Sequence, residues 1–167
     1  MIPRRHVRSA VFALAALLGV SGWAEAQKAI VVVRHAERQD DSTDSPLSEA
    51  GKARAARLAT MLRDAGVTTL CASQWQRTQQ TLAPLATATG LKVDIIPGAE
   101  IDTIVAAARR APATGVVVIA AHSDTAPKIL AALGVGEGVT IASGEYDNLF
   151  LVVPSTGSAP SLVRLRF

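Results

Sequence analysis

Chemically reactive side chains are concentrated in three short segments of the chain. Arg34 and His35 follow one apolar run, Arg77 comes after a second, and His122 follows a third. Phosphoryl transfer uses these groups, because a neutral imidazole can attack phosphorus and a guanidinium offers a planar fork to phosphate oxygens. Nearby arginines also lower the pKa of a histidine and keep its attacking nitrogen unprotonated. We therefore expect one nucleophilic histidine, a second histidine as hydrogen-bond donor, and two phosphate-binding arginines.

A metal site is a competing interpretation, because His35, Glu37, His122 and Asp124 are all of ligand type. Two fixed arginine charges would then stand beside a cation, and no H-x-x-x-H or H-E-x-x-H spacing is present. A single histidine at a strand end is more often structural than catalytic. An arginine at a helix start, as expected for Arg77, is opposed by the helix dipole and favours an anion bound there. Taken together, these residues favour phosphoryl transfer over metal binding.

The elements that position these residues follow from the hydrophobic pattern. Short apolar runs alternate with helical patterns, which predicts an α/β fold with a mostly parallel sheet covered on both faces. Ligands bind at the carboxyl ends of strands in such sheets, where the reactive residues fall. In the first helix we expect Leu58, Met61, Leu62 and Ala65 to form the buried face. The predicted strands are 30–33, 67–72, 92–96, 116–121, 148–153 and 162–167, the last a half-exposed edge strand, and the predicted helices are 48–65, 76–88, 101–110 and 125–133.

The N-terminal segment has the pattern of a secretory signal peptide. Arg4, Arg5 and Arg8 precede the uncharged run 9–20, and Ala24-Glu25-Ala26 supplies a cleavage site. A membrane-spanning helix needs about 20 apolar residues, so an uncleaved anchor is the minor alternative. We predict a signal peptide over residues 1–26 and one domain over 27–167. The mature protein would be periplasmic or secreted, without a stable membrane anchor.

Composition excludes some partners. The chain has 17 basic and 14 acidic side chains, and removal of residues 1–26 leaves 14 against 13. There is no lysine-rich tract or aromatic stripe of the kind that binds nucleic acid. Cys71 is the only cysteine, so no internal disulfide can form, and its apolar surroundings in the sequence predict a small buried hydrophobe.

Four ordered motifs resemble those of the histidine phosphatase (phosphoglycerate mutase-like) superfamily, and the chain is identified on them as a small exported bacterial member. Arg34-His35-Ala36-Glu37 after a strand resembles the R-H-G signature, with alanine in place of glycine. Residues 46–51 (PLSEAG) are similar to the P-L-[ST]-x-x-G helix start, and residues 73–81 (SQWQRTQQT) to S-x-x-x-R-x-x-x-T. Residues 121–125 (AHSDT) resemble the segment of the second histidine. The resemblance implies a three-layer α/β/α sandwich of the phosphoglycerate mutase type.

The resemblance also implies roles for individual residues. His35 would be the phosphorylated nucleophile, and Arg34, Arg77 and His122 would bind the transferring phosphate. Ser123 and Glu37 are further expected substrate contacts, although a structural hydrogen bond of Glu37 is an equal alternative. The candidates for the general acid are Glu100, Asp102 and Asp124, and the last could instead cap the helix after it.

The expected activity is hydrolysis of a phosphomonoester, which includes phosphoproteins and phosphohistidine, without a metal or other cofactor. The partner would be a phosphorylated small molecule or a phosphoprotein. A short chain leaves room for a lid only in residues 39–45 and 137–147, which favours a compact phosphatase over a mutase. A non-catalytic phosphate-binding or regulatory module with the same pocket is the alternative, and a metal-binding protein is the third.

Overall fold

The computed structural model describes residues 29–155 and 157–167. The signal peptide predicted over residues 1–26 lies outside the described residues. The described chain contains six strands and four helices, close to those expected from the sequence: β1 (Ala29–Arg34), α1 (Glu49–Leu62), β2 (Val67–Ala72), α2 (Gln76–Thr89), β3 (Val93–Ile95), α3 (Ile101–Arg110), β4 (Val116–Ala121), α4 (Thr125–Ala132), β5 (Asn148–Val153) and β6 (Ser161–Arg166).

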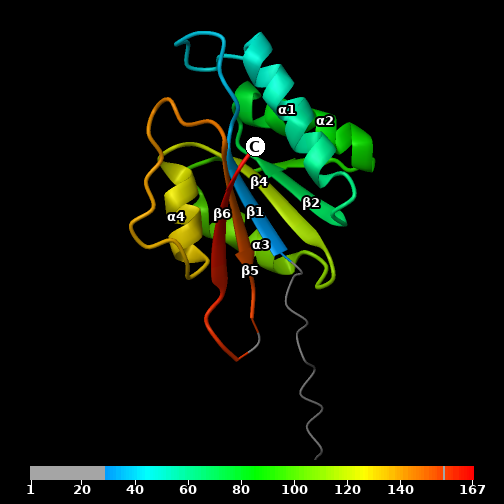
Figure 1. Cartoon of the computed structure of the whole chain (residues 1–167), viewed down its shortest axis with the longest axis vertical. Coiled ribbons are helices and arrows are strands. Elements are labelled where there is room, and N and C mark those ends of the chain that lie inside the picture. Colours follow the sequence, from blue (N-terminus) through cyan, green and yellow to red (C-terminus); the bar gives the residue numbers. More distant parts are fainter. Residues whose placement is uncertain (1–28, 156) are drawn as a thin grey trace, which may run out of the picture.

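The six strands form one mixed sheet in the order β3-β2-β4-β1-β5-β6. The first four of these are parallel to one another, and β5 and β6 are antiparallel additions at one side. Helical crossovers connect the parallel strands, as such pairs require. Figure 1 shows the strands fanned across the centre of the molecule. The α/β class and the mostly parallel sheet predicted from the sequence are confirmed.

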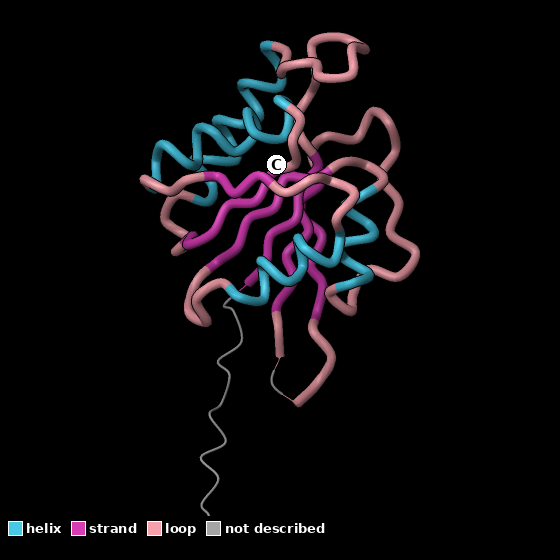
Figure 2. Tube along the Cα trace, turned by 180° about the vertical axis from the view of Figure 1, so that it is seen from behind, coloured by secondary structure: helices cyan, strands magenta, loops and turns pink. Residues whose placement is uncertain are grey.

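Alternating side chains of the central strand build the two halves of the core. Val31 and Val33 of β1 pack with α1 and α2 on one face, whereas Ile30 and Val32 pack with α3 and α4 on the other. This is the period of two that a strand imposes. Full burial of each such side chain stabilises the fold by about 1.5–3 kcal/mol. The helices flank both faces of the sheet (Figure 2), which gives the predicted three layers.

Two details of the buried faces differ from or extend the expectations. Met61 is 47% exposed, so its predicted place in the core is wrong. The buried stripe of α1 runs instead through small residues that allow close packing, Gly51, Ala55 and Ala59, together with Leu58 and Leu62. Strand β6 is the edge strand that its alternation predicted.

Within residues 29–155 and 157–167, no helix combines the length and apolarity needed to cross a membrane.

The sheet brings the predicted reactive residues to one edge. Parallel strands β1, β2 and β4 end at Arg34, Ala72 and Ala121, so His35, Ser73 and His122 follow at the same edge. The backbone N–H of His35 still donates to the Ala121 carbonyl at 2.8 Å, which extends the ladder between β1 and β4 by one step. The loops after β1 and before β5 lie at this same end of the molecule (Figure 1).

Candidate active site

A cavity of about 650 Å³ lies at the carboxyl ends of the parallel strands. Arg34, His35, Arg77 and His122 all line it, although they come from distant parts of the chain. The ring centroids of the two histidines are 5.3 Å apart. The structure therefore brings together the four residues from which phosphoryl transfer was predicted.

His35 is held in a defined protonation state. Its Nδ1 lies 2.7 Å from the carbonyl oxygen of Ala36, and because a carbonyl can only accept, Nδ1 carries the hydrogen. Burial and, to a smaller extent, the charges of His122, Arg34 and Arg77 together lower the pKa of His35 to about 3, against an opposing effect of the hydrogen bond to Ala36. At neutral pH the ring is therefore neutral, and Nε2 has a free lone pair, as a nucleophile requires.

Arg34 is fixed by the loop that precedes β5. Its Nη1 donates to the carbonyl oxygens of Ala142 at 2.9 Å, Ser143 at 2.8 Å and Glu145 at 3.0 Å. The Tyr146 ring stacks against the guanidinium, with Cζ 4.0 Å from the ring centroid. Nε is buried and has no hydrogen-bond partner among the described residues. Burial lowers the pKa of Arg34 from its ordinary value, and the side chain stays cationic because a guanidinium is not deprotonated in proteins.

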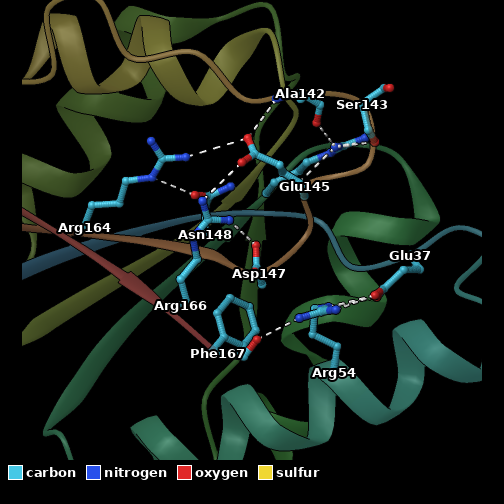
Figure 3. A network of polar contacts seen from close by, with 11 residues as sticks. Glu37, Arg54, Ala142, Ser143, Glu145, Asp147, Asn148, Arg164, Arg166 and Phe167 are labelled. Carbon is cyan, nitrogen blue, oxygen red and sulfur yellow. Dashed lines mark hydrogen bonds and ion pairs between the residues drawn. The ribbon is translucent and has the colours of Figure 1, made fainter.

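The loop around Arg34 is in turn held by β6. The Glu145 carboxylate accepts from the backbone N–H of Ala142 at 3.0 Å and from Arg166 at 3.1 Å, and Arg164 lies 3.7 Å away. Arg166 also bonds the Asp147 carboxylate. Figure 3 shows these contacts converging on Glu145 from the loop and from β6. The last strand therefore stabilises the carbonyl groups that orient Arg34.

Arg77 is positioned by the loop after β1. Its Nη1 donates to the Thr43 carbonyl at 2.8 Å, while the Asp44 carboxylate accepts from the backbone N–H of Gln76 at 2.7 Å at the start of α2. The anion expected at this helix start is thus Asp44, which leaves the Arg77 side chain to face the cavity. Burial lowers the pKa of Arg77, and the charge of Arg38 lowers it further.

His122 is anchored by a buried pair of hydroxyl groups. Its Nε2 lies 2.9 Å from Ser73 Oγ, and Ser73 Oγ lies 2.9 Å from Thr78 Oγ1. Burial, together with the charge of Arg77, lowers the pKa of His122 to about 4, although the charge of Asp124 opposes this. The second histidine is therefore also neutral at pH 7, and its ring orientation is set by Ser73.

The sequence comparison with protein families agrees with this geometry. The family model of the histidine phosphatase superfamily (branch 1) matches residues 30–103, which include the nucleophile segment, the helix start and the second arginine segment. Over these residues the chain is similar to the histidine phosphatase superfamily. This similarity supports phosphatase activity in general and does not specify a substrate. No curated protein matches the sequence.

Solved structures of three other proteins resemble the chain over most of its length. A protein from Escherichia coli K-12, provisionally described as an alpha-ribazole-5'-P phosphatase, has a TM-score of 0.67 at 15% identity, covering 83% of this chain and 96% of its own. A protein from Agrobacterium tumefaciens, provisionally described as the phosphohistidine phosphatase SixA, has a TM-score of 0.63 at 20% identity. The match covers 83% of this chain and 97% of that protein. The structure of the protein histidine phosphatase SixA complexed with tungstate has a TM-score of 0.64 at 16% identity. The match covers 83% of this chain and 96% of that protein. At these identities the likeness shows a shared fold.

The motifs that resemble those of the superfamily have clear structural reasons in this chain. Thr81 Oγ1 accepts from the backbone N–H of Ala36 at 2.9 Å and donates to the Arg77 carbonyl at 2.7 Å, so it ties the nucleophile loop to α2. Gly51 packs against the backbone of Glu37, where an added Cβ would lie 2.2 Å from the Glu37 carbonyl oxygen. Ala36 is fully buried, so the alanine that replaces the usual glycine is accommodated.

Glu37 does not contact the cavity, which corrects the expectation that it binds substrate. Its carboxylate accepts from Arg54 Nε at 3.0 and 2.9 Å and from Nη2 at 2.6 Å. Arg54 Nη1 donates to the Phe167 carbonyl oxygen at 2.7 Å. Figure 3 shows Glu37 facing α1 and β6 through this arginine. The alternative of a structural hydrogen bond is the correct one, although its partner is a helix residue and not a loop.

The three candidates for the general acid are separated by the structure. Asp124 lines the cavity, as does Ser123, whereas Glu100 and Asp102 are exposed and do not line it. Asp124 makes no capping bond to α4, so the expected capping role is wrong. Thr125 instead accepts from the backbone N–H of His122 at 2.9 Å. One carboxylate therefore remains in reach of the cavity.

Several cavity residues were missed by reasoning from the sequence. Arg38, Trp75 and Lys128 line the wall beside the predicted groups. Lys128 gave a usable signal, because a cation in the first turns of a helix opposes the dipole just as Arg77 does. Arg38 lies in a loop, where no periodicity indicates the direction of a side chain.

The metal-binding alternative lacks a ligand set in the described part of the chain. Of its four proposed ligands, Glu37 is bound to Arg54. Across residues 29–155 and 157–167, no group of three or more His, Cys, Asp or Glu side chains is placed to hold a metal ion. Arg34 and Arg77 bring positive charge to the same wall as the two histidines.

Proposed function

We propose that the chain is a phosphatase that acts through a phosphohistidine intermediate on His35. The observation that carries this proposal is the protonation state of His35. Its Nδ1–H is committed to the Ala36 carbonyl, and its low pKa leaves Nε2 unprotonated. Two arginines and a second histidine line the same cavity. Such an arrangement suits attack by Nε2 on a phosphoryl group whose oxygens are bound by cations.

The reaction would run in two steps. The lone pair of His35 Nε2 attacks phosphorus, the N–P bond forms, and the bond from phosphorus to the leaving oxygen or nitrogen breaks. Arg34 and Arg77 stabilise the charge on the phosphoryl oxygens, and His122 contributes a hydrogen bond. Water then attacks phosphorus, the N–P bond breaks, and inorganic phosphate and neutral His35 are released.

We assign proton transfer to Asp124, because it is the one carboxylate on the cavity wall among the described residues. It would protonate the leaving oxygen in the first step and accept a proton from the attacking water in the second. Asp124→Asn should then slow hydrolysis of alkyl phosphates about 100-fold. Hydrolysis of p-nitrophenyl phosphate, whose leaving group needs little protonation, should fall much less. Equal losses for both esters would remove Asp124 from this role.

Phosphorylated small molecules and phosphoproteins, including phosphohistidine, are the substrate classes under this proposal. We also propose a periplasmic or secreted location, supported by the signal-like pattern of residues 1–26. Cell fractionation followed by mass spectrometry of the N-terminus tests the location. A mature chain that begins at Gln27 is expected, and an intact chain in the cytosol would contradict it.

The decisive experiment is rapid quenching of the enzyme during turnover of p-nitrophenyl phosphate, followed by mass spectrometry at neutral to alkaline pH, where phosphohistidine survives. Phosphate on His35 is expected. His35→Asn should abolish both the adduct and turnover, and Lys92→Gln, at an exposed position beside the edge strand β3, is the control.

Two other outcomes separate the alternatives. Turnover without a histidine adduct, and sensitive to a chelator, would refute the phosphohistidine mechanism. Binding of inorganic phosphate without turnover of any activated ester would favour the non-catalytic phosphate-binding module.

A further inference from the structure

The cavity is much larger than the phosphoryl group that its catalytic residues would bind. Its volume is about 650 Å³, room for roughly twenty waters at about 30 Å³ each. Cavities of roughly 300–1,000 Å³ are typical of sites for small organic ligands. Most of the space must therefore hold the part of the substrate that is not transferred, and the wall around it should indicate the chemistry of that part.

Arg38 is one part of that wall. It lines the cavity beside Arg34 and Arg77, and its charge lowers the pKa of both. Its ion-pair partner, Asp41, has a side chain that is 94% exposed. Such exposed pairs contribute only about 0–1 kcal/mol, so Arg38 can turn to a ligand at little cost. Three guanidinium groups thus repel one another here, which an anionic ligand would relieve.

Lys128 is a second cation outside the phosphate-binding set. It is the fourth residue of α4, where the helix dipole disfavours a positive charge. Within the described ranges it forms no salt bridge, and it lines the same cavity from a different element than Arg38. Asp124, four residues earlier on the same side of the helix start, is the nearby carboxylate, but no salt bridge joins it to Lys128 among the described residues.

The charges on the wall do not balance with a phosphate alone. The wall carries four cations, Arg34, Arg38, Arg77 and Lys128, and one carboxylate, Asp124. Both histidines are neutral at pH 7 by their low pKa values. A phosphate monoester brings a charge of about −1.5 to −2 at this pH. About one positive charge is then left over, or about two when Asp124 is protonated for the first step, and the cations outside the proposed phosphate-binding pair are Arg38 and Lys128.

We propose that the cavity takes a small phosphorylated molecule that carries a second anionic group, which Arg38 and Lys128 bind. The inference rests on the proposed phosphatase function for the position of the phosphoryl group. The second group is a carboxylate, a sulfonate or another phosphate, since each offers oxygen acceptors to a guanidinium and an ammonium. Asp124 is assigned to proton transfer and not to binding of this group.

The test compares phenyl phosphate with 3-carboxyphenyl phosphate, which differ in the second anionic group and little in the leaving oxygen. The ratio of their kcat/KM values is the readout. We expect the wild type to favour the carboxylate-bearing ester about tenfold, the value of one charged hydrogen bond. Arg38→Gln and Lys128→Gln should each lower the ratio at least threefold. Lys92→Gln, which removes an exposed lysine beside β3, should leave it unchanged.

The outcomes distinguish this inference from the proposed function. If both esters are hydrolysed with a ratio near one that neither substitution changes, the second-anion site is refuted while the phosphatase function stands. If neither ester is hydrolysed, the proposed phosphatase function fails. The second-anion site is then tested by calorimetry with the His35→Ala variant, where the ratio of the two binding constants replaces the ratio of kcat/KM values. A phosphopeptide with acidic flanks that is hydrolysed with a higher kcat/KM than the carboxyphenyl ester would overturn the assignment to a small molecule.

Discussion

The pair formed by Glu37 and Arg54 offers the sharpest test of how this site is built. Glu37 is two residues from the nucleophile, yet its carboxylate is engaged by the Arg54 side chain in three hydrogen bonds of 2.6–3.0 Å. The two side chains are 22% and 16% exposed. Glu37→Gln and Arg54→Met, singly and together, therefore separate a structural role from a catalytic one.

The expected loss of stability follows from the short hydrogen bonds and the low exposure of the two side chains. Hydrogen bonds between charged groups contribute about 1.5–3 kcal/mol, and removal of one partner adds the cost of an unpaired, partly buried charge. We expect each single substitution to lower the free energy of unfolding by about 3 kcal/mol, with a coupling of about 2 kcal/mol in the double-mutant cycle. For a domain of this size that loss lowers Tm by about 10 °C.

The pH dependence of this contribution has a defined sign. Burial raises the pKa of Glu37, but the hydrogen bonds and positive charge around it, chiefly from Arg54, hold the pKa below its ordinary value. A carboxyl group with a lowered folded-state pKa stabilises the fold above its unfolded pKa, about 4.3, and loses that effect as pH falls through the folded value. The difference in stability between wild type and Glu37→Gln should therefore be constant from pH 6 to 8 and should vanish in acid.

The assay joins unfolding by urea with steady-state kinetics on p-nitrophenyl phosphate. Below the unfolding transition, both single variants should keep KM within twofold of the wild type, because neither residue lines the cavity. A tenfold rise in KM for Glu37→Gln, with unfolding unchanged, would refute the reasoning. It would restore the substrate-binding role that the sequence first suggested.

Three further predictions follow from contacts around the site. Glu145→Gln should weaken inhibition by inorganic phosphate about tenfold, because Glu145 holds the loop that orients Arg34. The control is Glu137→Gln at an exposed position, and an unchanged Ki for Glu145→Gln would contradict the prediction. Between pH 7 and 5 the free energy of unfolding should fall by about 2 kcal/mol for each of His35 and His122. Their folded-state pKa values are lowered to about 3 and 4, so only the unfolded chain takes up these protons. Urea titrations in which His35→Asn keeps the full pH dependence would count against it. Burial raises the pKa of Cys71 to about 11, so Ellman's reagent should label it only after unfolding, and labelling of the folded protein within minutes would disprove that burial.

The regular elements could be predicted from the sequence because burial dictates their pattern. Runs such as 30–33 and 116–121 are β-branched or small throughout, which fits strands buried on both faces. Once the parallel sheet was inferred, the position of His35 and His122 at one edge followed from topology alone. Their pairing needed no knowledge of the loops, and the predicted strand and helix bounds differ from those of the structure by few residues.

The partners of the site residues could not be predicted, because they lie on loops and distant strands. Glu37 meets Arg54 across 17 residues, and Arg34 meets Ala142 across 108 residues. Periodicity indicates which face of an element is buried, but it does not indicate where a loop carbonyl points. The same limit explains why Asp44, not a substrate, occupies the start of α2.

The contacts behind the two site arginines share one principle. Within the described residues neither Arg34 nor Arg77 forms a salt bridge, and each is oriented through Nη1 by backbone carbonyls. Carbonyl dipoles fix a guanidinium without cancelling its charge, whereas a carboxylate in contact would compete with the phosphate. The carboxylates stand one step further back, where Glu145 and Asp44 bind backbone N–H groups of the segments that position the arginines. Negative charge therefore stabilises the scaffold, and the positive charge of the arginines remains available to a substrate.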